Sequence, residues 1–180
     1  MTSVGCGVRK TAIAALAFLT VGCSGEAPQG EAPTVTQTFS RSSLPTVANP
    51  VDVPADADVC GMVDAGLLGD LGVTGDGQSR PGSCLWQTSD GTRLAVGLRV
   101  GRDPLLDIVG AGAPDVRLVE LHGFPAMHSG AKGRAMCDVY VKTGAEQGFS
   151  VAYGKAQRTD DDLCAPAISV AEQVAEGLRG

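Results

Sequence analysis

Residues 93–101 read RLAVGLRVG, the clearest alternation of side chains in the sequence. Successive side chains of a β-strand point to opposite faces of its sheet. One face of this segment would carry Leu94, Val96, Leu98 and Val100, and the other face Arg93, Ala95, Gly97 and Arg99. The stretch therefore predicts a strand with one face in an apolar core and the other face toward solvent.

Further segments around this strand have the alternation or the β-branched content of strands: residues 83–88, 116–121, 134–142 and 148–154. Ser89-Asp90-Gly91 is a hairpin turn signal between the first two strands, and a second hairpin turns through residues 144–147. The glycine-containing segments 75–82 and 122–133 are expected to be loops. The sequence thus predicts an antiparallel sheet of about five strands.

Helical periodicity flanks the predicted sheet. A first helix is expected over about residues 57–70, with Asp56 and Asp58 at its start and Gly72 as its stop. Asp103-Pro104 predicts a short helix over residues 105–110, because Asp caps a helix and Pro is favoured in its first turn.

A longer C-terminal helix follows Asp160-Asp161-Asp162. We interpret these aspartates as capping residues at the positive end of that helix, rather than as a cation site. Its apolar face comprises Cys164, Ala167, Ile168, Ala171, Val174 and Leu178. The fold class predicted from these elements is α+β, with N-terminal and C-terminal helices flanking an antiparallel sheet.

The N-terminus has the features of an export signal. Residues 9–23 read RKTAIAALAFLTVGC, so two cations precede an apolar run. That run of about 11 residues is too short to span a bilayer, which takes roughly 20. Leu19 to Cys23 resembles the lipobox of bacterial lipoproteins, at which the leader is removed and the cysteine receives acyl chains such as palmitate. We therefore predict a signal peptide over residues 1–22 and lipidation of Cys23.

The predicted lipid anchor is followed by a segment rich in Pro, Ser, Thr, Gly, Gln and Glu. Such a composition cannot bury enough apolar surface to offset chain entropy. We expect a disordered tether over residues 23–55 and a single domain over residues 56–180, which is a usual size for one domain.

The chain is acidic. It has 180 residues with 14 Lys and Arg against 20 Asp and Glu, a formal charge of −6, and loss of Arg9 and Lys10 with the leader makes this −8. Such a body is repelled by nucleic acid and by anionic headgroups. The sequence therefore argues against a nucleic-acid partner and leaves the lipid on Cys23 as the attachment to the membrane.

Four cysteines lie in the predicted domain: Cys60, Cys84, Cys137 and Cys164. An even number of cysteines in an exported domain predicts disulfides, whereas zinc ligands usually come in close pairs such as C-x-x-C, which are absent here. The favoured connectivity is Cys60–Cys84 with Cys137–Cys164, because each bridge would tie a helix to the neighbouring strand. The nested pairing Cys60–Cys164 with Cys84–Cys137 stays open.

The layout resembles a group of actinobacterial lipoproteins catalogued as a domain of unknown function. The resemblance rests on the lipobox, the tether, the Cys84-Leu85-Trp86 and Cys137-Asp138-Val139 strands, and Cys164 at the start of the last helix, and it covers about residues 55–178. It implies an α+β domain with an antiparallel sheet flanked by helices. It supplies no catalytic residue.

No residue of the sequence is assigned a catalytic, cofactor-binding or metal-binding role. His122, Met127, His128 and Met136 could form a soft copper site, but loop histidines and a core methionine also explain them. His128-Ser129 belongs to no hydrolase motif. Arg93 and Arg99 share a sheet face with small residues, which indicates either a shallow anion-binding surface or a solvated face.

These observations lead to an expected function outside catalysis. We expect a lipid-anchored protein on the extracytoplasmic face of the cell membrane, whose domain binds or senses an envelope protein, a glycan or a small ligand without a cofactor. The alternative is a carrier of an apolar ligand or lipid, with a cavity between the sheet and the helices.

Overall fold

A computed structural model describes residues 39–113, 115–130 and 133–179. Its elements in chain order are η1 (Arg41–Ser43), α1 (Ala65–Asp70), β1 (Gln78–Arg80), β2 (Ser83–Gln87), β3 (Arg93–Val100), α2 (Pro104–Gly110), β4 (Arg117–Leu121), β5 (Phe124–Ser129), β6 (Met136–Gly144), β7 (Gln147–Gly154) and α3 (Cys164–Arg179). None of the helices described is both long enough and apolar enough to cross a membrane.

The strands form one antiparallel sheet in the order β1-β2-β3-β7-β6-β5-β4. β3 lies inside this sheet, paired with β2 on one side and with β7 on the other. Leu94 and Val96 of β3 are buried in the core, whereas Arg93 is exposed. The α+β class and the antiparallel sheet are therefore confirmed. The predicted apolar face of β3 is confirmed at Leu94 and Val96 only, because Leu98 is partly exposed and Val100, at the end of the strand, is 52% exposed.

The predicted strand number was wrong, because the sheet has seven strands rather than about five. One missed strand is β1, which lies in a segment expected to be a loop. Its three residues are polar and all exposed, and it pairs only with β2. A short edge strand of this kind has no buried face and therefore no alternation that sequence reasoning could detect.

The second missed strand is β5, in the other segment expected to be a loop. His122 and Gly123 both have positive φ, 49° and 78°, and they join β4 to β5 as a two-residue hairpin loop. Pro125 favours a loop when the sequence is considered alone. In the structure it lies one residue before the β5–β6 ladder, which begins at Ala126. Proline is tolerated there because no ladder bond to β6 is lost.

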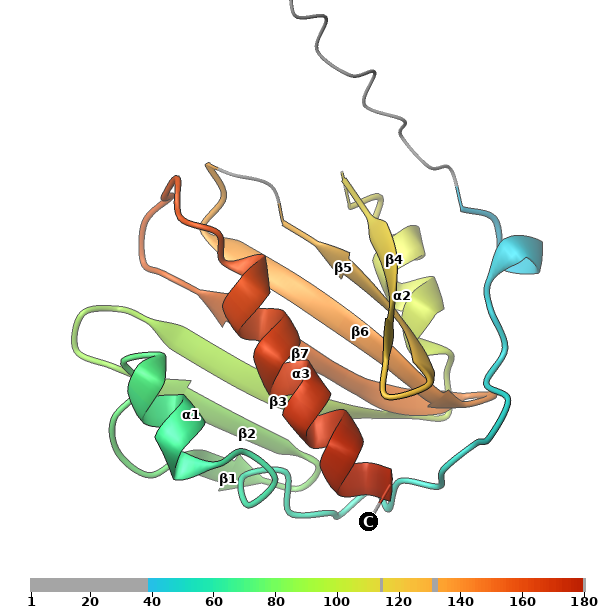
Figure 1. The fold of residues 1–180 in the computed structure, drawn as a ribbon, viewed down its shortest axis with the longest axis horizontal. Helices are drawn as coiled ribbons and strands as arrows, with labels where there is room; N and C mark the ends of the chain where they lie inside the picture. The colour runs from blue at the N-terminus through green and yellow to red at the C-terminus, as the bar shows by residue number, and fades with distance from the viewer. Residues whose placement is uncertain (1–38, 114, 131–132, 180) are drawn as a thin grey trace, which may run out of the picture. The chain divides into compact units, whose positions relative to one another are not determined.

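Helices cover the sheet from both sides. In Figure 1, α1 and α3 lie in front of the sheet and α2 lies behind it. The predicted C-terminal helix is confirmed as α3, which buries one face against β6 and β7. Its N-terminus is capped by Asp162, whose Oδ1 accepts from the backbone N–H groups of Cys164 and Ala165. Asp161 instead pairs with Lys155, Nζ to Oδ2 at 2.6 Å.

The second face of the sheet carries a smaller apolar cluster. Leu105 and Ile108 of α2 pack on Met127 of β5, and all three side chains are almost completely buried. Asp103 caps α2 by accepting from the Leu105 backbone N–H at 3.0 Å. The Lys142 ammonium of β6 lies 2.5 Å from the same carboxylate. This arrangement fixes α2 over one side of the sheet.

The first helix is shorter than predicted. It was expected over about residues 57–70, but α1 begins at Ala65 and is capped by Asp64, whose side chain accepts from the N–H groups of Gly66 and Leu67. The Asp58 carboxylate accepts from the Cys60 N–H at 3.1 Å, which stabilises a turn there. An aspartate that bonds to nearby backbone groups competes with helix formation.

The domain begins earlier than predicted. Residues 39–55 were expected to belong to a disordered tether, but Val53 is only 4% exposed, and the Val51 N–H donates to the Thr143 carbonyl at 2.9 Å. Phe39 and Leu44 pack against the α2 cluster. Sequence reasoning missed this segment because its apolar residues are widely spaced and follow neither helical nor strand periodicity.

The favoured disulfide connectivity is confirmed. Cys60 bonds to Cys84, and Cys137 bonds to Cys164, so the nested alternative is wrong. A glycine lies against each bridge. A Cβ on Gly130 would come within 2.9 Å of the Cys164 sulfur, and a Cβ on Gly77 would come within 2.7 Å of the Trp86 ring and closer still to the Cys84 sulfur.

Candidate functional site

One half of the sheet's second face is left open by α2. This helix covers β5 and β6, while β1, β2 and β3 extend beyond it. The open half has a floor of small residues, Ala95 and Gly97 of β3 and Ala152 of β7, all of them partly exposed. Small side chains leave the backbone accessible, so a shallow groove of about 490 Å³ forms over them.

Arg99 lies half-buried in this groove. Its Nε donates to the Ser150 hydroxyl at 3.2 Å, and its guanidinium carbon lies 5.9 Å from the centroid of the Tyr140 ring. Within the described part of the chain it forms no ion pair. The Ser150 hydroxyl in turn donates to the Gly97 carbonyl at 3.4 Å. The direct contacts that hold Arg99 in place are therefore to neutral groups, and Asp138 acts on it only as a nearby charge without a direct ion pair.

Asp138 of β6 lines the same groove. No hydrogen bond or ion pair links its carboxylate to another residue that the structure describes. Burial raises the pKa of Asp138 above its ordinary value, and the positive charges of Arg134 and Arg99 act in the opposite direction. A carboxyl group with a raised pKa takes up a proton more readily and can then donate a hydrogen bond.

The groove is electropositive for an acidic protein. The residues lining it include two arginines, Arg80 and Arg99, and one acid, Asp138, whereas the whole chain has a formal charge of −6. Local positive charge within a concave surface raises the concentration of anions there. An arginine can bind a carboxylate or phosphate through two parallel hydrogen bonds.

The four residues predicted to share a face of β3 do so, but only three of them line the groove. Ala95, Gly97 and Arg99 line it, whereas Arg93 is exposed and lies outside. The prediction did not include the groove residues of neighbouring strands: Asp138, Tyr140, Ser150 and Ala152. A signal for them was available, since they alternate with the predicted core positions of β6 and β7.

The four residues considered for copper are not gathered together. His122 is exposed in the β4–β5 turn, at the far end of β5 from His128. Met127 and His128 are consecutive strand residues, so they point to opposite faces, and Met127 packs under α2. His128 and the exposed Met136 line a common cavity of about 510 Å³ beside the start of α3.

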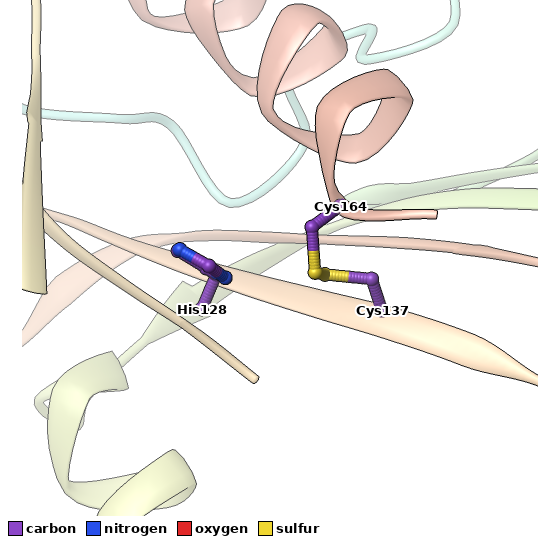
Figure 2. Close-up of side chains that lie close together, drawn as sticks. All are labelled: His128, Cys137 and Cys164. Carbon is purple, nitrogen blue, oxygen red and sulfur yellow. A yellow bond between two sulfur atoms is a disulfide. The ribbon is translucent and has the colours of Figure 1, made fainter. Parts of the chain in front are cut away.

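His128 lies beside the Cys137–Cys164 disulfide. Figure 2 shows one ring nitrogen turned toward the bridge, and the ligand atoms of these three residues lie within 4.8 Å of one another. His128 is 9% exposed, and its Nδ1 has no hydrogen-bond partner among the described residues. Burial, and to a lesser extent the positive charge of Arg117, lower the pKa of His128, so the imidazole stays neutral near pH 7.

The lipidation site predicted at Cys23 and the predicted leader lie outside the residues that the structure describes. Of the remaining predicted site residues, Cys60, Cys84, Cys137 and Cys164 form the two disulfides.

Comparison with known proteins identifies one relationship. The family model described as "Protein of unknown function (DUF3558)" matches residues 18–176. No curated protein and no solved structure matches the chain.

Proposed function

The chain belongs to the DUF3558 family, and from that premise we propose that it is a non-catalytic binding protein for a small anionic ligand. The protein is held on the extracytoplasmic face of the cell membrane by a lipid on Cys23. The family description carries no activity, so the proposal rests on the residues of this chain. The observation that carries it is the half-buried Arg99, which lines an open groove and forms no ion pair with another described residue.

The groove suits a ligand that combines an anionic group with a flat or narrow body. Arg99 and Arg80 supply the positive charge, and the small residues Ala95, Gly97 and Ala152 allow a ligand to lie close to the sheet. An ionised Asp138 would repel a bound anion. A protonated Asp138 would instead donate a hydrogen bond to it. The binding of an anion should therefore be stronger at acidic pH.

Binding outside the cytoplasm is supported by the N-terminal sequence. The apolar run ends at Gly22-Cys23, as in lipoproteins, and the two disulfides are typical of an oxidising compartment.

The ligand proposal is tested by thermal unfolding in the presence of small carboxylates and phosphate esters, with sodium chloride at matched ionic strength. We expect at least one anion to raise the melting temperature of the wild type and of Arg93→Ala, but not that of Arg99→Ala. Arg93→Ala is the matched control, because it removes an arginine from the same strand face outside the groove. An equal shift in Arg99→Ala, or no shift with any anion, contradicts the proposal.

The anchor is tested separately by expressing the full chain and Cys23→Ser in a bacterial host and partitioning each in a cloud-point detergent. The wild type should enter the detergent phase, and its measured mass should include the acyl chains. Cys23→Ser should remain in the aqueous phase or keep its leader. Equal partitioning of the two proteins would exclude lipidation at Cys23. It would leave the groove proposal unaffected.

A further inference from the structure

We propose that reduction of the Cys137–Cys164 disulfide creates a binding site for a thiophilic divalent cation such as Zn²⁺, with His128 as the third protein ligand. In the oxidised protein the two sulfurs are bonded to each other, and the sequence spacing of the four cysteines argues against a zinc site. The fold nevertheless brings these two sulfurs and a histidine together from β5, β6 and α3 (Figure 2).

The distances are close to those a metal site needs. Zinc binds thiolate sulfur at about 2.3 Å and imidazole nitrogen at about 2.0–2.1 Å, so neighbouring ligand atoms of a tetrahedral site lie about 3.6–3.8 Å apart. The nitrogen and the two sulfurs here already lie within 4.8 Å of one another. After reduction the two sulfurs would have to move apart from bonding distance and the histidine nitrogen would have to approach them for all three atoms to share one ion.

The buried His128 beside the Cys137–Cys164 bridge distinguishes this disulfide from an ordinary structural bridge. Its side chain is more than nine-tenths buried, and Nδ1 has no hydrogen-bond partner within the described residues. A buried polar atom without a partner costs about 1–3 kcal/mol. A metal ion bound to the histidine and the sulfurs would replace that loss with a coordinate bond.

The site has an opening for a fourth ligand and for the reductant. Cys164 and His128 line the cavity of about 510 Å³ at the start of α3, together with Asp161 and Asp162. A water molecule in this cavity could complete a tetrahedral set, and a dithiol could reach the Cys164 sulfur from the same side. Sites with three protein ligands and a water are a common form of zinc coordination.

The reaction balances with a dithiol as the reductant. The dithiol transfers two electrons and two protons to the bridge, the sulfur–sulfur bond breaks to give two thiols, and the dithiol becomes a disulfide. Binding of the divalent cation then displaces one proton from each thiol to solvent. Exchange with an oxidised dithiol, which accepts two electrons from the thiolates and two protons from solvent, would re-form the bridge and release the cation, so occupancy would follow the redox state.

The second disulfide supplies an internal control. Both histidines of the chain lie on the β4–β5 hairpin, His122 in its turn and His128 in β5, and Cys60 and Cys84 belong to no such three-residue group in the described residues. Reduction of Cys60–Cys84 should therefore give two thiols without the third ligand and bind the same cation much more weakly.

The test uses the full chain with Cys6→Ser and Cys23→Ser, so that the domain cysteines are the sole thiols. One protein then carries Cys60→Ser with Cys84→Ser, and the other carries Cys137→Ser with Cys164→Ser. Each is reduced with a phosphine under argon and titrated with Co²⁺, which reports thiolate ligation by a charge-transfer band. Thermal unfolding is followed with and without Zn²⁺.

We expect the protein that retains Cys137 and Cys164 to bind one equivalent of Co²⁺ and to melt at a higher temperature with Zn²⁺. His128→Ala in that protein should weaken binding at least about tenfold, since even outer-shell partners are worth about 10–100-fold. The reduced protein that retains Cys60 and Cys84 should give a band only at much higher Co²⁺ concentration, and both proteins when oxidised should show no band.

The proposal is overturned if the reduced protein gives no band, or if His128→Ala binds Co²⁺ as tightly. It is also overturned if the reduced chain is unfolded by circular dichroism, or gains no thermal stability from Zn²⁺, because the site then does not belong to the folded domain.

Discussion

The Lys142 ammonium of β6 lies 2.5 Å from the Asp103 carboxylate at the N-terminus of α2, and both side chains are largely buried, with exposed fractions of 9% and 13%. Removal of one partner leaves an uncompensated charge in a low-dielectric site, which costs about 3–5 kcal/mol. Lys142→Met and Asp103→Asn should each lower the free energy of unfolding by that amount in urea titrations, although Asn retains the helix cap.

The double variant of this pair is the control. With neither charge present, the loss should be clearly smaller than the sum of the two single losses. Additive losses would mean that the two side chains act independently and that α2 is held by its apolar contacts alone.

The glycines that lie against the disulfides should not tolerate a methyl group. In Gly130→Ala the new Cβ would lie 2.9 Å from Cys137 Cα, and in Gly77→Ala it would collide with Trp86 and the Cys84 sulfur. Overpacking of this kind costs typically about 1–3 kcal/mol. Gly69→Ala in α1 is the matched control. Nothing lies within 4 Å of its Cβ, so it should stabilise by about 0.5–1 kcal/mol.

Chemical denaturation under non-reducing conditions measures all three variants. If Gly130→Ala and Gly77→Ala were as stable as Gly69→Ala, the close approach of these glycines to the bridges would not be a feature of the native packing.

The parts of the fold that the sequence predicts well are those with a strong local signal. The alternation of residues 93–97 and most of the predicted apolar face of α3 correspond to the observed burial, whereas Val100 at the end of β3 is exposed. The disulfide pairing was also predicted correctly, because each bridge joins two cysteines that are neighbours in the order of the four domain cysteines along the chain. The parts missed have no local signal of their own, since β1 is held by pairing with β2 and residues 39–55 by contacts with distant β6 and β7.

The candidate site was only partly predictable for the same reason. Arg99 and its small neighbours follow from the alternation within one strand. Asp138, Tyr140 and Ser150 join the groove through the strand order β3-β7-β6, which places segments about 40 to 50 residues away beside β3. Strand order is a property of the whole sheet, and no short stretch of sequence encodes it.

Asp138 should make stability depend on pH. Burial raises the pKa of Asp138 in the folded protein above its ordinary value of 3.8. The folded state therefore binds this proton more tightly than the unfolded chain does. Its contribution to stability is present below pH 3.8 and is lost as the pH rises through the folded pKa.

Asp138→Asn removes that dependence. It should be more stable than the wild type at pH 7, and the difference should shrink as the pH falls to 3.8 and below. Urea titrations at pH 3.5, 5 and 7 measure this difference directly. A constant difference across that range would contradict the assignment of the raised pKa to Asp138.

Residues 39–55 should stabilise the domain through Gln147. Its Nε2 donates to the Asp52 carboxylate at 2.6 Å and to the Val51 carbonyl at 3.3 Å. Gln147→Ala should therefore cost about 1–2 kcal/mol in a chain that begins at Phe39. In a chain that begins at Asp56 the same substitution should cost little, because the partners are absent.

The truncation itself should also be costly. Val53 is buried to 4% exposure, and burial of a valine side chain contributes about 1.5 kcal/mol or more. Equal stability of the chains that begin at Phe39 and at Asp56, measured by urea unfolding, would assign residues 39–55 to the tether after all.

The central claim is that an anion binds beside Arg99 in the open half of the sheet. The most direct measurement is a titration of ¹⁵N-labelled protein with the anion that gives the largest thermal shift, followed by amide chemical shifts at pH 5 and pH 7. We predict perturbations at Gly97, Arg99, Asp138 and Ser150 with tighter binding at pH 5, and at least about tenfold weaker binding by Arg99→Ala. Perturbations confined to α3 or the β4–β5 hairpin, or unchanged affinity in Arg99→Ala, would contradict the claim.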